Sequence, residues 1–205
     1  MKITIAGAGI AGLVTALALD ADGHDIEIFE AVQEIKPLGV GINLLPHAAA
    51  VLSGLGVLDD LLKSGVATSE LGYFNRYGQK IWSESRGLYA GQNAPQVSIA
   101  RGELQRILLH HVQKRLGESR IHSGHRLVSF SNKKDQAFAI FSTPSSNELT
   151  VHSDILICAD GIHSAARAQL YPDEGAPLYS GRLLWRATTM APPFLSGSSM
   201  IMAGH

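Results

Sequence analysis

The 205-residue sequence predicts an α/β fold built on a parallel β-sheet. One observation is the order of the first elements: a short apolar strand at residues 2–6, a helical stretch ending near Ala21, and a second apolar strand, Ile26–Phe29. The other is the apolar run Asp154–Ala159, which lacks the polar alternation of a half-exposed strand. Such runs are typical of strands buried in parallel sheets.

Three glycines join the first strand to the helix in the pattern Gly7-Ala8-Gly9-Ile10-Ala11-Gly12. Gly7 permits a tight turn, Gly9 leaves room for a pyrophosphate to approach the backbone, and Gly12 lets the helix pack closely on the strand. The helix N-terminus presents free N–H groups to the phosphates. Glu30, at the end of the second strand, can accept hydrogen bonds from a ribose diol. This combination predicts a dinucleotide site.

The same apolar stretch has a second interpretation as a signal peptide or membrane anchor over Ile3–Leu19. Its three glycines, the lack of a basic segment before it and the absence of a cleavage site argue against this interpretation. We therefore favour the nucleotide site.

Composition limits the remaining function classes. Apolar residues make up 45% of the chain and charged residues 17%, and the net charge is −1. No basic field points to a nucleic acid or to an anionic membrane surface, so neither is an expected partner. The single cysteine, Cys158, excludes an intramolecular disulfide framework and fits a reducing compartment. We expect a cytoplasmic protein with one full domain and part of another.

The segment after Glu30 alternates loops and short elements. Ile35–Asn43 is expected to be a loop whose glycines permit either an ordinary turn or close approach to a ligand. Pro46 opens a helical segment that glycines divide into two short helices. Residues 71–74 and 80–82 flank a glycine-containing turn and predict a hairpin. Aromatic residues gather there, mostly for packing, although one or two could line an aromatic substrate pocket.

Arg101 begins the most regular helix of the sequence, which Gly117 ends. A cation at a helix N-terminus is mildly unfavourable because it opposes the helix dipole. An anionic ligand would explain the position of Arg101, but a surface arginine there also costs little.

The last third of the sequence predicts more strands. Residues 126–131, 137–142 and 148–152 are expected to form an antiparallel meander. The buried strand 154–159 ends at Asp160-Gly161, where open α/β sheets bind ligands; a helix N-cap by Asp160 is the alternative. Strand character returns at residues 182–188, and another apolar run starts at Met200.

Other kinds of catalytic site have little support. The adjacent His110 and His111 point to different faces of a helix, and His122 and His125 lack a third ligand nearby, so no metal site is expected. Cys158 fits a small core residue. Hydrolase and phosphoryl-transfer motifs are absent from the sequence, and no side chain is assigned as catalytic.

Taken in chain order, these motifs resemble the N-terminal half of the class A FAD-dependent aromatic hydroxylases, the family of para-hydroxybenzoate and salicylate hydroxylases. Three matches carry the resemblance, and together they cover nearly all of the chain. They are the glycine turn with Glu30, Arg101 after Ser98-Ile99, and Asp160-Gly161 within residues 158–167.

Finer matches point to the branch that includes phenazine-carboxylate hydroxylase. They are residues 37–43, 81–84, 95–99 and 101–105. The sequence departs from that branch beside these matches at Lys36, Ser85 and Ala100, and also at Ala187, where a glycine usually follows Trp-Arg. Ala100, in place of a histidine, matters most because it adjoins Arg101.

The resemblance implies a Rossmann-like FAD-binding fold, with a parallel sheet and a β-meander crossover, followed by the start of a mixed-sheet substrate domain. NADH or NADPH would reduce the FAD, and a flavin hydroperoxide would then hydroxylate a small aromatic substrate. The glycine turn would face the pyrophosphate, Glu30 the adenosine ribose and Leu127 the adenine. The implied cofactor-binding residues are Gly7, Gly9, Gly12, Glu30, Gly41, Ile42, Asn43, Arg101, Leu127, Asp160 and Gly161.

The resemblance also implies a missing half. Family members are about twice as long, and their second half carries a Gly-Asp motif that this sequence lacks. We expect an FAD-binding domain over residues 1–177, with 66–100 contributing strands towards the substrate domain, and a truncated substrate-binding domain over 178–205. Either the chain is truncated or another chain supplies the rest. A non-catalytic FAD-binding fragment, a flavin halogenase or a reductase of the same fold are the alternatives.

Overall fold

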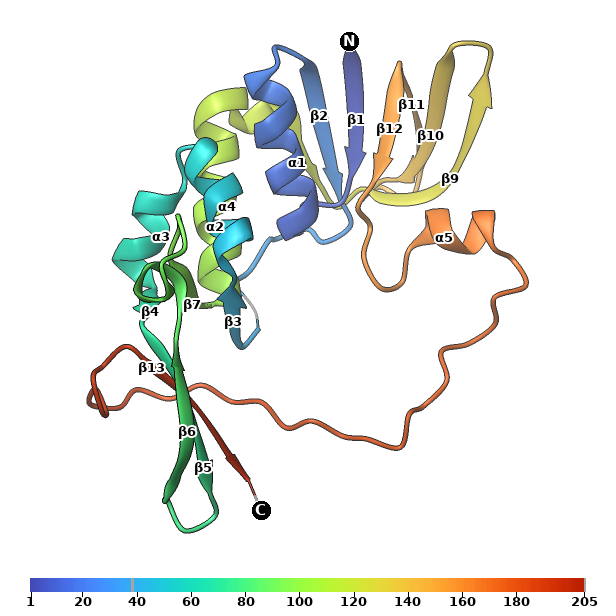
Figure 1. Cartoon of the computed structure of the whole chain (residues 1–205). Coiled ribbons are helices and arrows are strands. Elements are labelled where there is room, and N and C mark those ends of the chain that lie inside the picture. Colours follow the sequence, from blue (N-terminus) through green and yellow to red (C-terminus); the bar gives the residue numbers. More distant parts are fainter. Residues whose placement is uncertain (38, 205) are drawn as a thin grey trace. The chain divides into compact units, whose positions relative to one another are not determined.

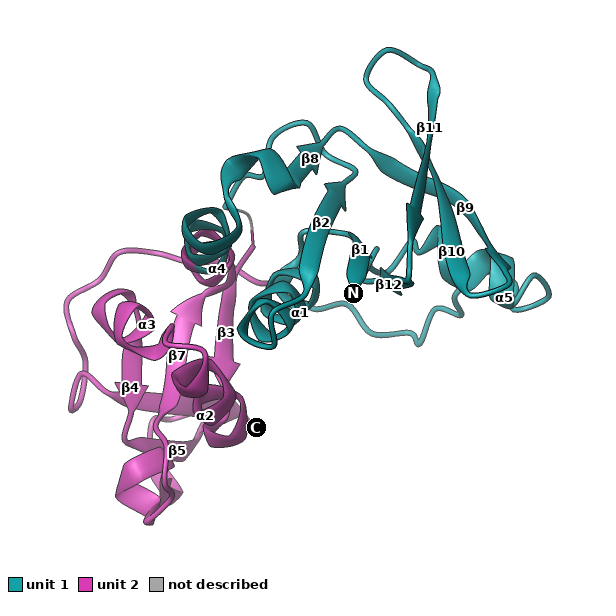
Figure 2. Ribbon diagram, turned by 90° about the horizontal axis from the view of Figure 1, so that it is seen from above, with its two compact units in different colours: residues 1–37, 108–184 teal, residues 38–107, 185–205 magenta. Residues whose placement is uncertain are grey.

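The computed structural model describes residues 1–37 and 39–204 (Figure 1). Two compact units make up the chain: residues 1–37 with 108–184, and residues 38–107 with 185–205 (Figure 2). Two positions within the predicted segments lie outside the described residues, Leu38 of the expected loop 35–43 and His205 at the chain's last position. Among the described residues no helix has the length and apolarity to cross a membrane.

The first unit contains the predicted parallel sheet, with strand order β12-β1-β2-β8. Its strands are β1 (Lys2–Ala6), β2 (Asp25–Glu30), β8 (Ile121–Ser123) and β12 (Ile155–Cys158). Helix α1 (Ile10–Ala21) runs beside β1 and β2 (Figure 1). Its apolar residues Leu13 and Leu17 are fully buried, as are Ile3 and Ile5 of β1. The α/β fold with a parallel sheet is therefore confirmed.

The predicted meander lies beyond β12 in the same unit (Figure 2). It consists of β9 (Arg126–Lys133), β10 (Gln136–Ser142) and β11 (Glu148–Ser153). Phe29 of β2 connects it to the parallel sheet, because its ring stacks on Phe141 of β10 at 4.4 Å between centroids and on His122 at 4.5 Å. Such aromatic pairs bury large apolar areas in a fixed geometry.

The short helix α5 (Ala165–Leu170) docks on the meander through one side chain. The side-chain carbonyl of Gln169 accepts a hydrogen bond from the Phe130 N–H at 3.0 Å, and its amide donates to the Phe130 carbonyl oxygen at 2.7 Å. Gln169 thus pairs with the backbone of β9 as a neighbouring strand would. These two hydrogen bonds hold α5, which follows β12 in the chain, against the meander.

The second unit contains two small sheets and the paired helices α2 (Pro46–Gly54) and α3 (Leu58–Ser64). One sheet has the order β3-β7-β4 and is antiparallel, with β3 (Gly41–Leu44), β4 (Val66–Thr68) and β7 (Gln96–Ala100). The other has the order β13-β5-β6, with β5 (Glu70–Asn75), β6 (Lys80–Ser85) and β13 (Ser199–Gly204). Because β13 pairs with β5 in parallel and β6 pairs with β5 antiparallel, this sheet is mixed.

A 3₁₀ turn spans Gly87–Ala90 and another Glu118–Arg120. Helix α4 (Arg101–Leu116) follows β7 directly and begins and ends where the sequence predicts. The predicted helices at 46–64 and the hairpin at 71–82 are also present.

Three predictions about local structure are wrong. Residues 41–43, the end of the expected loop 35–43, belong to β3 because they pair with β7. Residues 182–188 form no strand; no described strand pairs with them, and their apolar side chains are exposed. The strand Asp154–Ala159 is not fully buried, because β12 lies at the sheet edge, where Ile155 is 38% exposed. For the same reason Cys158 is exposed and is not a core residue.

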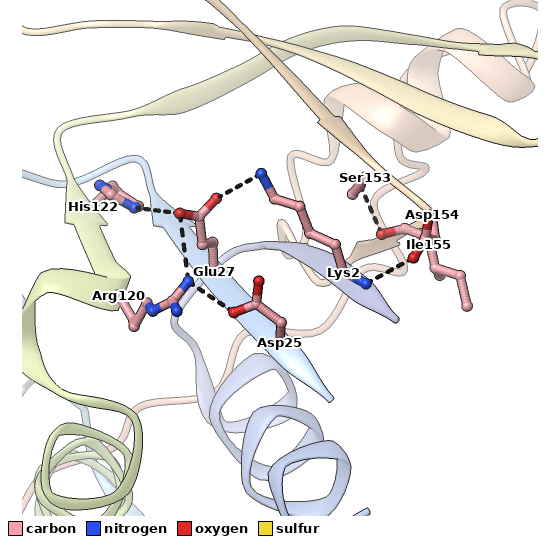
Figure 3. Close-up of polar contacts among 8 residues, drawn as sticks. All are labelled: Lys2, Asp25, Glu27, Arg120, His122, Ser153, Asp154 and Ile155. Atoms are coloured by element: carbon pink, nitrogen blue, oxygen red, sulfur yellow. Dashed lines mark hydrogen bonds and ion pairs between the residues drawn. The ribbon is translucent and has the colours of Figure 1, made fainter. Parts of the chain in front are cut away.

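A polar cluster crosses the strands of the parallel sheet (Figure 3). The Glu27 carboxylate of β2 lies 3.6 Å from Lys2 Nζ, 3.8 Å from Arg120 Nη1 and 3.9 Å from His122 Nε2. Arg120 also pairs with Asp25 at 2.8 Å. Burial lowers the pKa of His122, and the Glu27 carboxylate opposes this shift. His122 therefore favours its neutral form in the folded protein.

Protonation of His122 should make folding stability depend on pH. Because the pKa is lower in the folded protein, the unfolded chain binds more protons as pH falls through about 6.5, the ordinary histidine value. The contribution of His122 to the free energy of unfolding should therefore be constant above that pH and should fall below it. Urea unfolding of the wild type and His122→Phe, which keeps an aromatic ring against Phe29, measures this. Equal pH slopes in the two proteins would contradict the assignment.

The glycine turn provides a second test of stability. A Cβ built at Gly12 would overlap the Gly7 carbonyl oxygen, whereas one built at Gly9 meets no atom within 4 Å. Gly12→Ala should therefore lower the free energy of unfolding by about 1–3 kcal/mol or more, as overpacking does. Gly9→Ala is the matched control and should fold as the wild type does. Denaturant unfolding of both variants gives the comparison, and equal stabilities would show that α1 packs less closely than described.

Candidate functional site

A cleft of about 250 Å³ opens in the first unit, where three parallel strands end. The chain passes from β1 to β2 on one side of β1 and later reaches β12 on its other side, so the strand order reverses at this point. Ligands of open α/β sheets bind at such reversals, beyond the carboxyl ends of the strands. The cleft is lined by Ala6, Gly7, Gly9, Phe29, Glu30, Ala31, His125, Arg126, Leu127, Ala159, Asp160, Gly161, His163 and Ala165.

The glycine turn forms one wall of the cleft. Gly7 adopts a φ of +106°, and a Cβ there would overlap the Ala159 carbonyl oxygen. The Gly7 N–H donates to the Phe29 carbonyl oxygen at 2.7 Å, which ties the turn to the end of β2. Gly9 is the N-cap of α1 and has no side chain to cap it. The empty space at Gly9 and the uncapped helix N-terminus fit an approaching anionic group.

Glu30 lies at the carboxyl end of β2, as predicted, and braces the turn. One carboxylate oxygen accepts a hydrogen bond from the Ala8 N–H at 2.7 Å, and the other accepts one from the Val32 N–H at 2.9 Å. Each carboxylate oxygen has two lone-pair sites, so both can still accept a hydroxyl hydrogen bond. Glu30 can therefore hold the turn and bind a ribose diol together.

Asp160 organises the opposite wall. Its carboxylate accepts hydrogen bonds from the Ser164 hydroxyl at 2.6 Å and from the N–H groups of Ala165 at 2.7 Å and Ala166 at 3.3 Å. The N-cap of α5 is Ser164, whose hydroxyl oxygen accepts the Arg167 N–H at 2.9 Å. The alternative prediction, that Asp160 is itself the N-cap, is thus wrong. The chain turns at Gly161, which has a φ of +80°, and α5 begins only after Ser164.

The sequence anticipated only part of the remaining lining. Leu127 is 4% exposed and belongs to the core cluster behind the cleft. Phe29, His125 and Arg126 also line the cleft and are not among the predicted site residues. Phe29 directly precedes Glu30 and Arg126 directly precedes Leu127 in the sequence, which was the available signal.

The other four predicted site residues belong to the second unit. Gly41, Ile42 and Asn43 lie on β3. Arg101 is exposed at the first position of α4, and its N–H donates to the Val40 carbonyl oxygen at 2.9 Å. Its guanidinium makes no ion pair with any residue in the described part of the chain. Six of the predicted residues thus line one cleft, and Gly12 packs α1 against the turn that forms its wall. The other four belong to the second unit.

Gly39 explains how the Arg101 side chain is accommodated. Gly39 has a φ of +116°, and a Cβ there would lie 3.3 Å from Arg101 Cδ. A larger residue at position 39 would have to displace the arginine stem. Gly39 therefore serves the placement of Arg101 within this unit.

The Cys158 thiol lacks the lowered pKa of a reactive cysteine. Partial burial raises its pKa, and the nearby Asp160 carboxylate raises it further. The thiol is therefore protonated at neutral pH and is a poor nucleophile.

Comparisons with known proteins agree with the site geometry. Residues 1–182 match the family described as FAD binding domain. The chain is 43% identical over 204 residues to phenazine 1,6-dicarboxylic acid hydroxylase PhzS of Lysobacter antibioticus, covering 98% of this chain and 50% of that protein. This similarity confirms the resemblance to the phenazine-carboxylate hydroxylase branch.

Solved structures give the same fold. Klebsiella pneumoniae HpxO complexed with FAD and uric acid matches with a TM-score of 0.66 and 28% identity over 82% of this chain and 41% of that one. The p-nitrophenol 4-monooxygenase PnpA of Pseudomonas putida matches with a TM-score of 0.75 and 22% identity over 82% of this chain and 42% of that one, which supports the fold.

The chain spans about half the length of the curated relatives it matches, 50% of the phenazine hydroxylase and 47% of a Klebsiella pneumoniae FAD-dependent urate hydroxylase. The glycine turn, Glu30 and the Asp160 loop all lie within the matched residues, around the cleft described above. On this agreement of sequence, fold and family match, the chain belongs to the FAD-binding domain family of flavoprotein monooxygenases.

Proposed function

We propose that this chain is the FAD-binding half of an NAD(P)H-dependent monooxygenase that hydroxylates an aromatic or heteroaromatic small molecule. The cleft at the strand-order reversal carries this proposal, because it combines an uncapped helix N-terminus with a carboxylate at the adjacent strand end. Those are the two features that a dinucleotide needs. The cleft is smaller than the ~300–1,000 Å³ of typical small-molecule sites, so it would hold one end of the cofactor.

Each predicted residue has a role in this proposal. Gly7, Gly9 and Gly12 bring the N-terminus of α1 to the pyrophosphate, Glu30 accepts the adenosine ribose hydroxyls, and Leu127 lies against the adenine. The residues with roles elsewhere along the cofactor are Arg101 at its pyrophosphate and ribityl chain, Gly41, Ile42 and Asn43 beside the flavin ring, and Asp160 and Gly161 towards both FAD and the nicotinamide nucleotide.

FAD, when bound, supplies the redox and oxygen chemistry, and the protein supplies binding, orientation and exclusion of water. Neither the protonated Cys158 thiol nor any other side chain needs to act as a nucleophile. The substrate class follows from the names of the relatives, which hydroxylate phenazine dicarboxylic acid and urate. A planar heteroaromatic ring is therefore the substrate that we propose.

The boundaries and setting are part of the same proposal. The FAD-binding domain spans residues 1–177, residues 66–100 contribute strands towards the substrate domain, and the substrate-binding domain begins at 178. The C-terminal half of the enzyme is supplied either by the continuation of this chain or by a separate chain. A cytoplasmic setting is proposed on the basis of the single unpaired cysteine.

The first test is nucleotide selectivity. Purified chain titrated with FAD and, separately, with NAD should bind FAD more tightly, as measured by calorimetry and flavin absorbance. Micromolar binding of NAD without binding of FAD would contradict the proposed cofactor.

Replacing Glu30 tests the ribose contact. Glu30→Gln removes the charge from a hydrogen bond worth about 1.5–3 kcal/mol, and its amide group would also face the N–H of Ala8 or Val32. FAD affinity should fall at least several-fold. Glu34→Gln is the control, because that exposed carboxylate pairs with Lys36 outside the cleft and its loss should leave affinity unchanged. An unchanged dissociation constant in Glu30→Gln would place the ribose elsewhere.

A third test concerns the chain by itself. Leu183, Leu184 and Trp185 are 68–89% exposed, and a flavin bound to this half alone would be open to water. The chain should oxidise NAD(P)H without forming hydroxylated product. Oxygen uptake measured with phenolic and phenazine substrates, with products read by mass spectrometry, tests this. Stoichiometric hydroxylated product would show that these residues suffice for the reaction.

A further inference from the structure

A chain of side-chain hydrogen bonds crosses the second unit and ends on Asn43. The Thr68 hydroxyl of β4 lies 2.6 Å from the Ser98 hydroxyl of β7, and the Ser98 hydroxyl lies 2.6 Å from Asn43 Oδ1 on β3. On its other side, Asn43 Nδ2 lies 3.1 Å from the sulfur of Met200 on β13. Four strands of the unit thus contribute one side chain each.

The direction of these bonds follows from the number of hydrogens available. A thioether sulfur has no hydrogen to donate, so the side of the Asn43 amide that faces Met200 must be the NH₂ group. The carbonyl oxygen then faces Ser98 and accepts its only hydroxyl hydrogen. Ser98 can therefore only accept from Thr68, which donates. Thr68, Ser98 and Asn43 form a relay with one polarity.

The two ends of the relay differ in burial, so their hydrogen bonds have different roles. Thr68 is 2% exposed, so its hydroxyl needs a partner, and pairing it with Ser98 is ordinary sheet stabilisation. Asn43 is exposed, and an exposed amide can pair with water at no cost. Holding it still costs side-chain entropy without satisfying a buried group. One amide hydrogen of Asn43 remains without a partner among the described residues.

We propose that Ser98 and Thr68 are positioning residues that orient the Asn43 amide, so that its remaining N–H donates to a ring acceptor of the flavin, a carbonyl oxygen or an imine-type nitrogen. This inference rests on the proposed function, which places residues 41–43 beside the flavin ring. A donor fixed before binding loses less entropy when the ligand arrives. The relay thus orients the Asn43 donor before the ligand binds and does not itself contact the ligand.

The test measures the amide and the ligand separately. Side-chain ¹⁵N relaxation of Asn43 reports its order in the ligand-free chain, and titration with FAD, followed by flavin fluorescence and by the Asn43 amide shifts, reports the contact. Ser98→Ala removes the donor to Asn43, and Ser98→Thr keeps it. Thr68→Val removes only the support behind Ser98. Ser69→Ala is the matched control, because its hydroxyl pairs with that of Ser198 at 2.6 Å in the same unit, outside the relay.

The Asn43 amide should be rigid in the wild type and mobile in Ser98→Ala. FAD should shift its resonances, and affinity should fall about three- to tenfold in Ser98→Ala, the effect of one lost hydrogen bond. Ser98→Thr should restore both properties, Thr68→Val should show a smaller change of the same sign, and Ser69→Ala none. Thr68→Val keeps the test decisive if Ser98→Ala unfolds.

Two results would overturn the inference while the proposed function stands. The first is a wild-type Asn43 amide as mobile as in Ser98→Ala. The second is FAD binding of equal affinity in wild type and Ser98→Ala without any shift of the Asn43 resonances. If the wild type did not bind FAD at all, the proposed function would be contradicted, and the inferred contact with the flavin would fail for that reason.

Discussion

The close contact between the turn at Gly7 and the start of helix α1 is the constraint on which the first unit depends. Side chains at Gly7 and Gly12 would overlap the carbonyl oxygens of Ala159 and Gly7, respectively. Only glycine at both positions lets β1, α1 and the segment after β12 meet at one point. That meeting point is where the strand order reverses, so the packing requirement and the ligand site have the same cause.

The surroundings of this point show how binding groups are also structural groups. Glu30 accepts the Ala8 N–H, and Asp160 accepts two N–H groups at the start of α5, so both acids order the walls of the cleft. Phe29 stacks on Phe141 and on His122 and so joins the meander to the parallel sheet, one residue before Glu30 in β2. A ligand at the cleft would therefore meet groups that are already held in place, which lowers the entropy cost of binding.

Local signals in the sequence predicted most of the fold. Glycine spacing, apolar periodicity and turn residues located β1, α1, β2, the meander and α4, because these elements are specified by their own residues. The errors fall where a distant partner decides. β3 exists because β7 pairs with it, residues 182–188 lack a partner, and the exposure of Cys158 depends on the place of β12 at the sheet edge. Likewise, the hydrogen bonds that run from Thr68 through Ser98 and Asn43 to Met200 join four strands, and no local pattern in the sequence marks them.

The central claim is that the carboxyl ends of β1, β2 and β12 hold the adenosine and pyrophosphate end of FAD. Amide hydrogen exchange of the chain with and without FAD, resolved to single residues, tests it most directly. The account predicts slower exchange at Gly9 to Ala11 and around Glu30 when FAD is present. Protection confined to other surfaces, with exchange at the turn unchanged, would contradict it.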